Sequence, residues 1–235
     1  MSSVVDLEAV RQEYLRRMTQ GDGRLLREVE DYITARSGKM LRPQLTLLAA
    51  ATLGPEHLNS RRTLLLATCV EMLHNASLLH DDVIDRADER RSRPSVNARW
   101  GNAVAVLVGD YHLAQIMRLL DEVNDADASR MVNNTVTAMV EAELLAQQVG
   151  GRPTSREQYL SIVDGKTARL FATACALGNP AYEGFGLHYG RLFQLRDDVA
   201  DGEATEWTSQ LIADEEAVLT TIPGLPIAQR CKKTP

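Results

Sequence analysis

Apolar residues recur at helical spacing along nearly the whole chain, and strand-like alternation is absent. Clusters of Gly, Pro and Asn separate the periodic segments, at residues 19–23, 37–43, 53–59, 123–127, 150–155 and 177–180. The pattern predicts an all-α fold of roughly seven or eight helices joined by short connections. Composition agrees, because aromatic residues make up only 5% of the chain while Ala and Leu are abundant.

The domain organisation follows from where this pattern weakens. With 235 residues, the chain can bury one large helical core. No linker or low-complexity tract interrupts it up to about residue 202, so we expect one helical domain over residues 1–202. Residues 203–235 have one weak helical stretch, near 209–221, followed by Pro, Gly and a basic end. We expect them to form an atypical, peripheral tail.

Several functional classes are disfavoured by composition. A net charge of −6 argues against a general nucleic-acid surface. The three cysteines, Cys69, Cys175 and Cys231, lack the spacing of a disulfide framework or a zinc site. The N-terminus lacks the apolar stretch of a signal peptide, and no apolar run approaches the ~18 residues of a membrane span. We therefore expect a soluble, cytoplasmic protein.

Two short segments repeat one carboxylate spacing, DDVID at 81–85 and DDVAD at 197–201. Because each helical residue advances about 100°, Asp81, Asp82 and Asp85 would share one face, which Asp88 and Glu89 would join if the helix continued. Carboxylates this close repel one another, so cations must compensate them. Nearby arginines would suffice for one such cluster, but two equal spacings favour Mg²⁺, which joins carboxylates to phosphates. The candidate ligands are Asp81, Asp82, Asp85, Asp197, Asp198 and Asp201.

The segments "EMLHNASLLHDDVIDRADERR" and "FQLRDDVAD" resemble the two aspartate-rich motifs of the trans-isoprenyl diphosphate synthases, also called polyprenyl synthetases. The resemblance covers most of residues 25–201. It implies an isoprenoid-synthase-type helical bundle around a central active-site cavity, and a prenyltransferase that joins isopentenyl diphosphate to geranyl, farnesyl or geranylgeranyl diphosphate. It also implies three Mg²⁺ ions with diphosphate bound, and a homodimer or a heteromer with a full-length synthase. The chain leaves the pattern near Gly202, so we expect the usual C-terminal helices to be lacking and activity to be impaired or partner-dependent.

The resemblance also assigns the residues that bind substrate. The isopentenyl diphosphate side comprises Gly38, Lys39, Arg42, His74 and Arg91. The allylic diphosphate side comprises Arg90, Lys166 and Thr167, and Gln194 matches a further glutamine of the family next to the second motif. The catalytic set is Asp81, Asp82, Asp85, Lys166, Asp197 and Asp198. Taken singly, each has a more ordinary interpretation as a surface charge, a packed histidine or a helix-facing threonine.

Two small residues, Ala76 and Ser77, stand where short-chain members of the family carry aromatic side chains. The resemblance therefore implies a long-chain product. Ser37 and Ser92 replace glycines that are frequent in the family, and Arg93 follows Ser92. Two other interpretations stay open: a noncatalytic or regulatory subunit, favoured by the tail, and a class I terpene cyclase, which needs no second diphosphate pocket.

Overall fold

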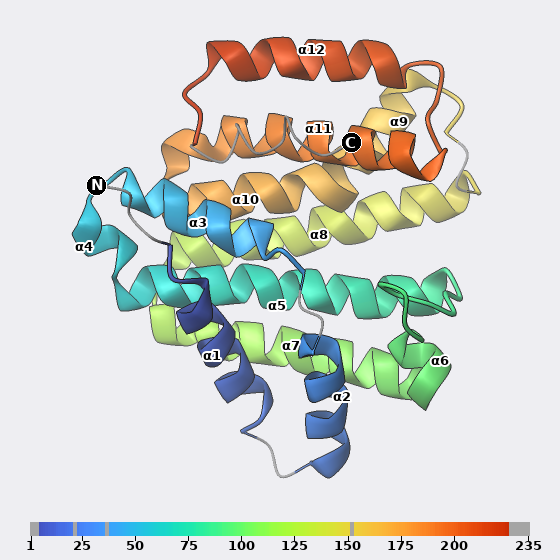
Figure 1. The fold of residues 1–235 in the computed structure, drawn as a ribbon. Helices are drawn as coiled ribbons and strands as arrows, with labels where there is room; N and C mark the ends of the chain where they lie inside the picture. Colours follow the sequence, from blue (N-terminus) through green and yellow to red (C-terminus); the bar gives the residue numbers. More distant parts are fainter. Residues whose placement is uncertain (1–4, 21–22, 36–37, 151–152, 226–235) are drawn as a thin grey trace. The chain divides into compact units, whose positions relative to one another are not determined.

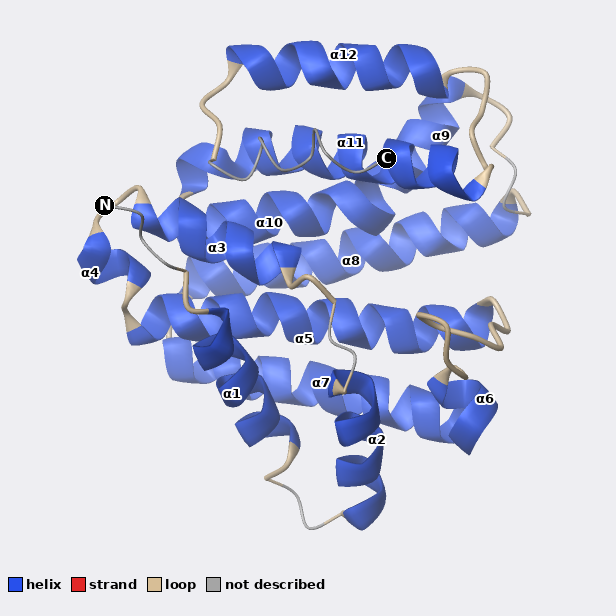
Figure 2. Cartoon of the chain, viewed as in Figure 1, coloured by secondary structure: helices blue, strands red, loops and turns tan. Residues whose placement is uncertain are grey.

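The computed structural model describes residues 5–20, 23–35, 38–150 and 153–225, and these residues form helices joined by short turns (Figure 1). Within them the β-structure is limited to one isolated bridge between Glu89 and Pro94 (Figure 2). The predicted all-α class is confirmed. The chain divides into two compact units, one from Met1–Gln44 and Ser60–Asp125, the other from Leu45–Asn59 and Ala126–Pro235. Each unit carries one of the aspartate motifs.

The first unit is built around a long central helix. Its helices are α1 (Leu7–Met18), α2 (Arg24–Thr34), α5 (Arg61–Ile84), α6 (Val96–Trp100) and α7 (Asn102–Val123). Helix α5 begins where the Ser60 hydroxyl accepts the Thr63 N–H at 3.1 Å, and it packs mainly against α7. Its middle turns are buried nearly all round, as an interior helix requires.

Helix α7 has the length and mean hydropathy of a possible membrane span, with 44% of that window buried inside the structure. The sequence contains no uninterrupted apolar run here because Asp110 and His112 lie within it. Its inner face, including His112 and Ile116, is buried against the rest of the first unit. Helix α7 is thus a core helix with one buried face and one solvent-exposed face.

The second unit surrounds another buried helix. Its elements are α4 (Pro55–Leu58), α8 (Ala126–Gln148), α9 (Arg156–Val163), the π-helical turn η1 (Asp164–Ala168), α10 (Arg169–Gly178), the 3₁₀ turn η2 (Pro180–Tyr182), α11 (Glu183–Asp201) and α12 (Thr208–Thr221); α3 (Leu41–Ala51) begins in the first unit and continues into the second. Every residue of α10 after its first is buried. Ser155 is the N-cap of α9, as predicted, and accepts the Gln158 N–H at 3.2 Å. Short elements such as α4 and η2 make the described helices more numerous than expected.

Helix α12 confirms the helical stretch predicted near residues 209–221 and lies along α11 (Figure 1). Leu211 is buried in an apolar cluster with Tyr159, Val163 and Leu195. Arg156 of α9 also forms an ion pair with α12. Helix α12 therefore packs against the rest of the second unit through Thr208, Leu211 and Glu215, while its other residues are exposed or partly exposed.

Candidate functional site

Both aspartate motifs end a helix with the same backbone cap. The carbonyl of Asp82 accepts the Ala87 N–H at 2.9 Å, and the carbonyl of Asp198 accepts the Glu203 N–H at 2.7 Å. In each case the residue before the donor has a positive φ, as in a Schellman motif. A helix C-terminus carries partial negative charge, so grouping carboxylates there is unfavourable unless cations offset them.

In the first motif, the middle aspartate is already paired with a cation. Asp82 is only 3% exposed, and Arg90 Nε donates to its Oδ1 at 2.9 Å. Asp81 is half-buried, whereas Asp85 is exposed and lies one residue beyond the end of α5. The three carboxylates therefore do not act as one open face, because Asp82 is bonded to Arg90. Asp88 follows in the loop rather than on the helix.

The arginine pair after this motif lies in a tight two-residue turn. The backbones of Arg90 and Arg93 exchange hydrogen bonds of 2.7 and 3.2 Å, and Arg91 and Ser92 between them have φ values of 54° and 58°. Positive φ at both central residues is typical of a type I′ turn, which explains why glycine suits position 92. The turn brings Arg91 against Gly38, where a Cβ would lie 2.8 Å from Nη2 of the guanidinium. Gly38 and Arg91 thus lie together, as predicted.

Further arginines surround the buried face of α5. Burial lowers the pKa of His74 well below its usual value, and Arg42, Arg91 and Arg90 lower it further, so the ring is neutral. Burial raises the pKa of Glu71, while Arg42 and Arg91 oppose that rise. Sequence reasoning missed Glu71, although it lies one turn before His74 on the same helix face.

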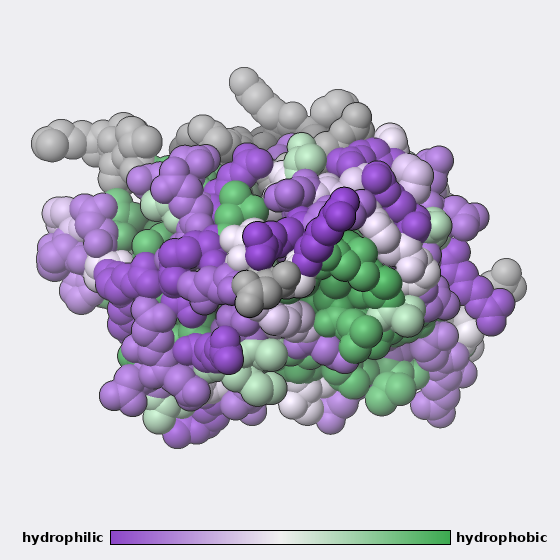
Figure 3. All heavy atoms as spheres, turned by 90° about the horizontal axis from the view of Figure 1, so that it is seen from below, coloured by the Kyte–Doolittle hydropathy of each residue, from purple (hydrophilic) through white to green (hydrophobic). Residues whose placement is uncertain are grey.

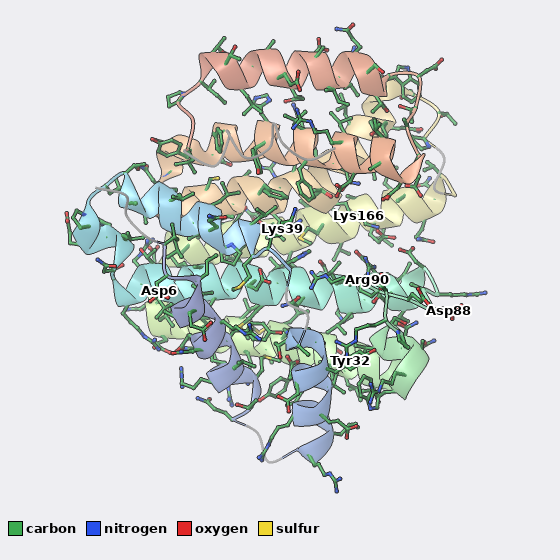
Figure 4. The ribbon with its side chains drawn as sticks, in the orientation of Figure 1. Asp6, Tyr32, Lys39, Asp88, Arg90 and Lys166 are labelled. Carbon is green, nitrogen blue, oxygen red and sulfur yellow. The ribbon has the colours of Figure 1, made fainter. Side chains whose placement is uncertain are left out.

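A pocket in the first unit opens between α2, α5 and this loop, with about 510 Å³ of empty space including its open mouth. Asn75 and the Asp82–Arg90 pair form polar parts of its wall. The Tyr32 hydroxyl donates to the Pro94 carbonyl at 2.7 Å, and Arg93 lies 3.6 Å from the centre of the Tyr32 ring. These contacts tie the loop to α2 (Figure 4).

Of the two residues predicted to control product length, Ala76 is buried and Ser77 is partly exposed on α5. The Ser77 hydroxyl donates to the His74 carbonyl at 2.9 Å. Lys39 is exposed on the segment between α2 and α3 (Figure 4). The isopentenyl-side residues thus include a compact set at Gly38, Arg42, His74 and Arg91.

In the second motif, the middle aspartate is held by neutral groups. Asp198 is 8% exposed and accepts a short hydrogen bond from the Tyr159 hydroxyl and one of 2.7 Å from Gln194 Nε2. Thr167 donates to Gln194 Oε1 at 2.8 Å, so three predicted residues form one hydrogen-bonded chain. Burial, together with Asp198, raises the pKa of Tyr159 well above its usual value. Tyr159 lies outside the recognisable motifs and was missed.

Lys166 and Thr167 lie on the π-helical turn η1, a widened turn of a kind frequent at functional sites. Lys166 Nζ lies 2.7 Å from Glu143 of α8 (Figure 4). The pKa of Glu143 is lowered because hydrogen bonds from Lys166 and Gln147 outweigh the raising effect of burial. Gly165 allows η1 to approach α8, since a Cβ there would lie 2.4 Å from that of Ala142.

The remaining motif carboxylates have the chemistry of Mg²⁺ ligands. Asp85, Asp197 and Asp201 are exposed at the ends of their helices. Among the described residues, no three His, Cys, Asp or Glu side chains are grouped closely enough to hold a metal ion by themselves. Mg²⁺ commonly completes its shell with water and phosphate oxygens, so this donor set fits ions that arrive with a diphosphate.

The chain is similar to a family of known proteins over most of its length. A family model described as polyprenyl synthetase matches residues 23–234, past Gly202, where the motifs showed no further resemblance. The chain is 37% identical over 187 residues to the all-trans-nonaprenyl-diphosphate synthase (geranyl-diphosphate specific) of Rhodobacter capsulatus, a match covering 75% of this chain and 57% of that protein. It is 35% identical over 224 residues to octaprenyl diphosphate synthase of Haemophilus influenzae, covering 90% and 67% respectively.

Solved structures give the same result. The crystal structure of a polyprenyl synthase from Caulobacter crescentus CB15, complexed with calcium and isoprenyl diphosphate, matches with a TM-score of 0.77 at 33% identity. That match covers 82% of this chain and 61% of the other. The matched part thus spans between 57% and 67% of these proteins' own lengths. Since the family model covers most of the sequence and both aspartate motifs, the chain belongs to the polyprenyl synthetase family.

Proposed function

We propose that the protein is a Mg²⁺-dependent trans-prenyltransferase that condenses isopentenyl diphosphate with an allylic diphosphate to give a long-chain polyprenyl diphosphate. The observation that carries the proposal is the set of Gly38, Arg42, His74 and Arg91 beside the first aspartate motif. A terpene cyclase ionises one diphosphate and needs no second cationic pocket. The matched nonaprenyl and octaprenyl synthases support a long-chain product.

In this proposal the first unit binds isopentenyl diphosphate. Arg42 and Arg91 present forked guanidinium groups suited to bidentate contact with phosphate oxygens, and Lys39 adds a third positive charge. Neutral His74 donates one ring N–H and accepts at the other nitrogen. Glu71 lies near enough to Arg42 and Arg91 for their charges to act on it, so it would hold the two guanidinium groups at this end of α5.

The allylic diphosphate is bound by Arg90, Lys166 and Thr167, with Gln194 orienting Thr167. Asp81, Asp85 and Asp197 would hold the three Mg²⁺ ions directly, with Asp82, Asp198 and Asp201 as direct or water-mediated partners. When bound, the ions neutralise charge that develops on the departing diphosphate. Lys166 and Arg90 stabilise the same charge by hydrogen bonds as the C–O bond ionises. The isopentenyl double bond then attacks the allylic carbon, and the proton lost from the product passes to the leaving diphosphate.

The test is a turnover assay with the purified chain, Mg²⁺, labelled isopentenyl diphosphate and each of three allylic diphosphates, followed by measurement of product length. Elongation that disappears in Asp81→Ala supports the proposal. Turnover that appears only with a second, full-length synthase present would make the chain a noncatalytic subunit. Cyclic hydrocarbon formed without isopentenyl diphosphate would make it a cyclase.

Product length offers a separate test of the assigned channel. Ala76→Phe fills space on α5 close to the first motif, so we expect the product to shorten while kcat for the first condensation is retained. Ser77→Phe should act in the same direction. The control is Leu64→Phe, a substitution just over three turns before Ala76 on the same helix. An unchanged product distribution in both phenylalanine variants would contradict the assignment.

We also propose that the protein is a cytoplasmic homodimer formed through α7. Exposed apolar residues on α7 fall within an arc of about 100° and include Ala103, Val106, Leu107, Ala114 and Met117. Figure 3 shows a group of apolar side chains at the surface in this view. Leu107, 66% exposed, would be buried in the dimer, so Leu107→Lys should convert it to a monomer in sedimentation velocity. A monomeric wild type that binds only a full-length synthase would favour the heteromer instead.

A further inference from the structure

A chain of ion pairs in the second unit links helix α12 to the π-helical turn η1. Arg191 of α11 donates from Nε and Nη2 to the two oxygens of Asp164, at 2.5 and 2.7 Å. Its Nη1 donates to Oε1 of Glu215 on α12 at 3.2 Å. Glu215 is only 5% exposed, and its other oxygen lies 2.6 Å from Nδ1 of His188. A buried carboxylate, a forked guanidinium and the first residue of η1 are thus joined directly.

The turn that this chain holds presents Lys166 and Thr167. Asp164 precedes Lys166 by two residues, and the backbone carbonyl of Asp164 accepts the Arg169 N–H that closes the wide turn. On its other side η1 is packed against α8 through Gly165 and the Lys166–Glu143 ion pair. A π-helical turn is less stable than the α-helix on either side, so its shape depends on such external contacts.

We propose that Asp164, Arg191 and Glu215 are positioning residues for the allylic diphosphate group, through which α12 fixes Lys166 and Thr167. The inference rests on the proposed function, since it assumes that these two residues bind a diphosphate. It gives a role to α12, the helix whose sequence lies beyond the recognisable motifs. Among the tail's described residues, Glu215 is linked to this turn through Arg191 and Asp164.

The chain offers a matched control one turn away. Arg196 of α11 pairs with Glu216 of α12 at 2.5 Å, so it also joins these two helices. That pair is more exposed, with 31% and 51% of the two side chains accessible, whereas both carboxylate oxygens of Asp164 accept from Arg191. Arg191→Met and Arg196→Met therefore remove the same kind of contact between the same helices, but only the first releases Asp164.

The kinetic arm compares Michaelis constants for the two substrates. In Arg191→Met we expect the KM for the allylic diphosphate to rise about tenfold. Lys166 and Thr167 would no longer be held in place, and a displacement of up to about 1 Å weakens their contacts with the diphosphate sharply. The KM for isopentenyl diphosphate should be unchanged. Arg191→Lys, which keeps the charge but not the fork, should show a smaller rise. Arg196→Met should leave both constants at wild-type values.

A second arm needs no turnover. Amide hydrogen exchange of a peptide spanning residues 160–172 should be faster in Arg191→Met and Glu215→Gln than in wild type, and unchanged in Arg196→Met. If the wild type makes no product, the proposed function fails and this arm alone decides whether the ion-pair chain holds η1. If Arg191→Met does not fold, Asp164→Asn replaces it. Wild-type exchange in these variants, or equal effects in Arg191→Met and Arg196→Met, would overturn the inference.

Discussion

The two aspartate motifs share one spacing and one helix cap, yet they balance the charge of their middle carboxylate in opposite ways. Asp82 is bonded to the guanidinium of Arg90. Asp198 is bonded to the hydroxyl of Tyr159 and the amide of Gln194, which carry no charge. The same five-residue pattern therefore places its buried middle carboxylate against a positive charge in the first unit and against neutral groups in the second.

The surroundings extend this contrast. Around the first motif, Arg42, Arg90 and Arg91 act together on His74. Around the second motif, the cations already have carboxylate partners, since Lys166 pairs with Glu143 and Arg191 with Asp164. The first unit thus groups three guanidinium groups around His74, whereas these two cations near the second motif are each paired with a carboxylate. Repeated sequence motifs predict donor atoms, but the neighbours decide the charge each motif presents.

The largest expected effect tests whether both halves serve one reaction. Asp81→Ala and Asp197→Ala should each lower kcat by about 10²–10³-fold, since each removes an outer carboxylate needed to offset charge on the departing diphosphate. Circular dichroism should be unchanged, because Asp197 is exposed and Asp81 only half-buried. Asp127→Ala, at the exposed start of α8, is the control. A full loss in one variant with wild-type turnover in the other would separate the two motifs functionally.

The next effect concerns pH and should arise in the first unit. Tyr14, Glu30 and His112 are bonded together in its core, with Tyr14 Oη 3.0 Å from Glu30 Oε2 and 2.7 Å from His112 Nε2. Burial raises the pKa of Glu30 to about 8 and lowers that of His112 to about 4. Folded Glu30 therefore keeps a proton that the unfolded chain has lost, and its stabilisation fades as pH rises towards 8.

Between pH 6.5 and 8 the His112 ring is neutral in the folded protein and only partly protonated in the unfolded chain, so the free energy of unfolding should fall by about 1 kcal/mol, mainly because of Glu30. As pH falls below 6.5, two effects on the free energy of unfolding oppose each other. His112 lowers it, because the unfolded chain accepts a proton that the buried ring does not, while Glu30 continues to raise it. The free energy of unfolding should therefore change little with pH in this range. Urea unfolding across this range measures it. In Glu30→Gln the decline above pH 6.5 should vanish; a persistent decline would place its origin elsewhere, including the second unit.

A smaller effect separates the two middle aspartates directly. A double-mutant cycle with Arg90→Met and Asp82→Asn should give a coupling free energy of about 1–2 kcal/mol at low salt, which falls as salt rises because Arg90 is partly exposed. A cycle with Tyr159→Phe and Asp198→Asn should give about 1–2 kcal/mol without that salt dependence, since one partner is neutral. Both are read from urea unfolding. Equal salt dependence would remove the contrast between a cation-held and a neutrally held carboxylate.

Local sequence signals predicted the features that depend on nearby residues. The helical period set the fold class, and Ser155 could be assigned as an N-cap because its partner is Gln158, three residues on. The repeated spacing of the motifs predicted Asp198 as a site residue, the family resemblance predicted Thr167 and Gln194, and the structure joins the three by hydrogen bonds. What such signals could not give was the path of the loop that returns Arg90 to Asp82.

The residues that were missed share a different property. Glu71, Glu143 and Tyr159 are single polar side chains within otherwise ordinary helices, and their roles come from what packs beside them. Helix α12 was expected at the surface because its amphipathic pattern is weak, but Leu211 and Glu215 are buried by contacts with distant helices. The π-helical turn likewise depends on tertiary contacts, because its sequence carries no distinctive breaker apart from Gly165.

The smallest effects should come from the two caps, which share hydrogen bonds but differ in the residue that takes the left-handed position. That residue is Arg86 in the first motif, with φ 52°, and Gly202 in the second, with φ 76°. A side chain at positive φ costs about 1 kcal/mol, so Arg86→Gly should stabilise the protein and Gly202→Ala should destabilise it by about that amount. Thermal unfolding measures both, with Gly184→Ala inside α11 as the control for glycine replacement in a helix, since a Cβ there meets nothing within 4 Å. The control lies in the first turn of α11 and should itself be slightly stabilising, because alanine has the higher helix propensity. If Arg86→Gly proves neutral or destabilising, the arginine side chain must itself stabilise the first motif by enough to offset the backbone strain. The two caps would then differ in charge as well as in the residue at positive φ.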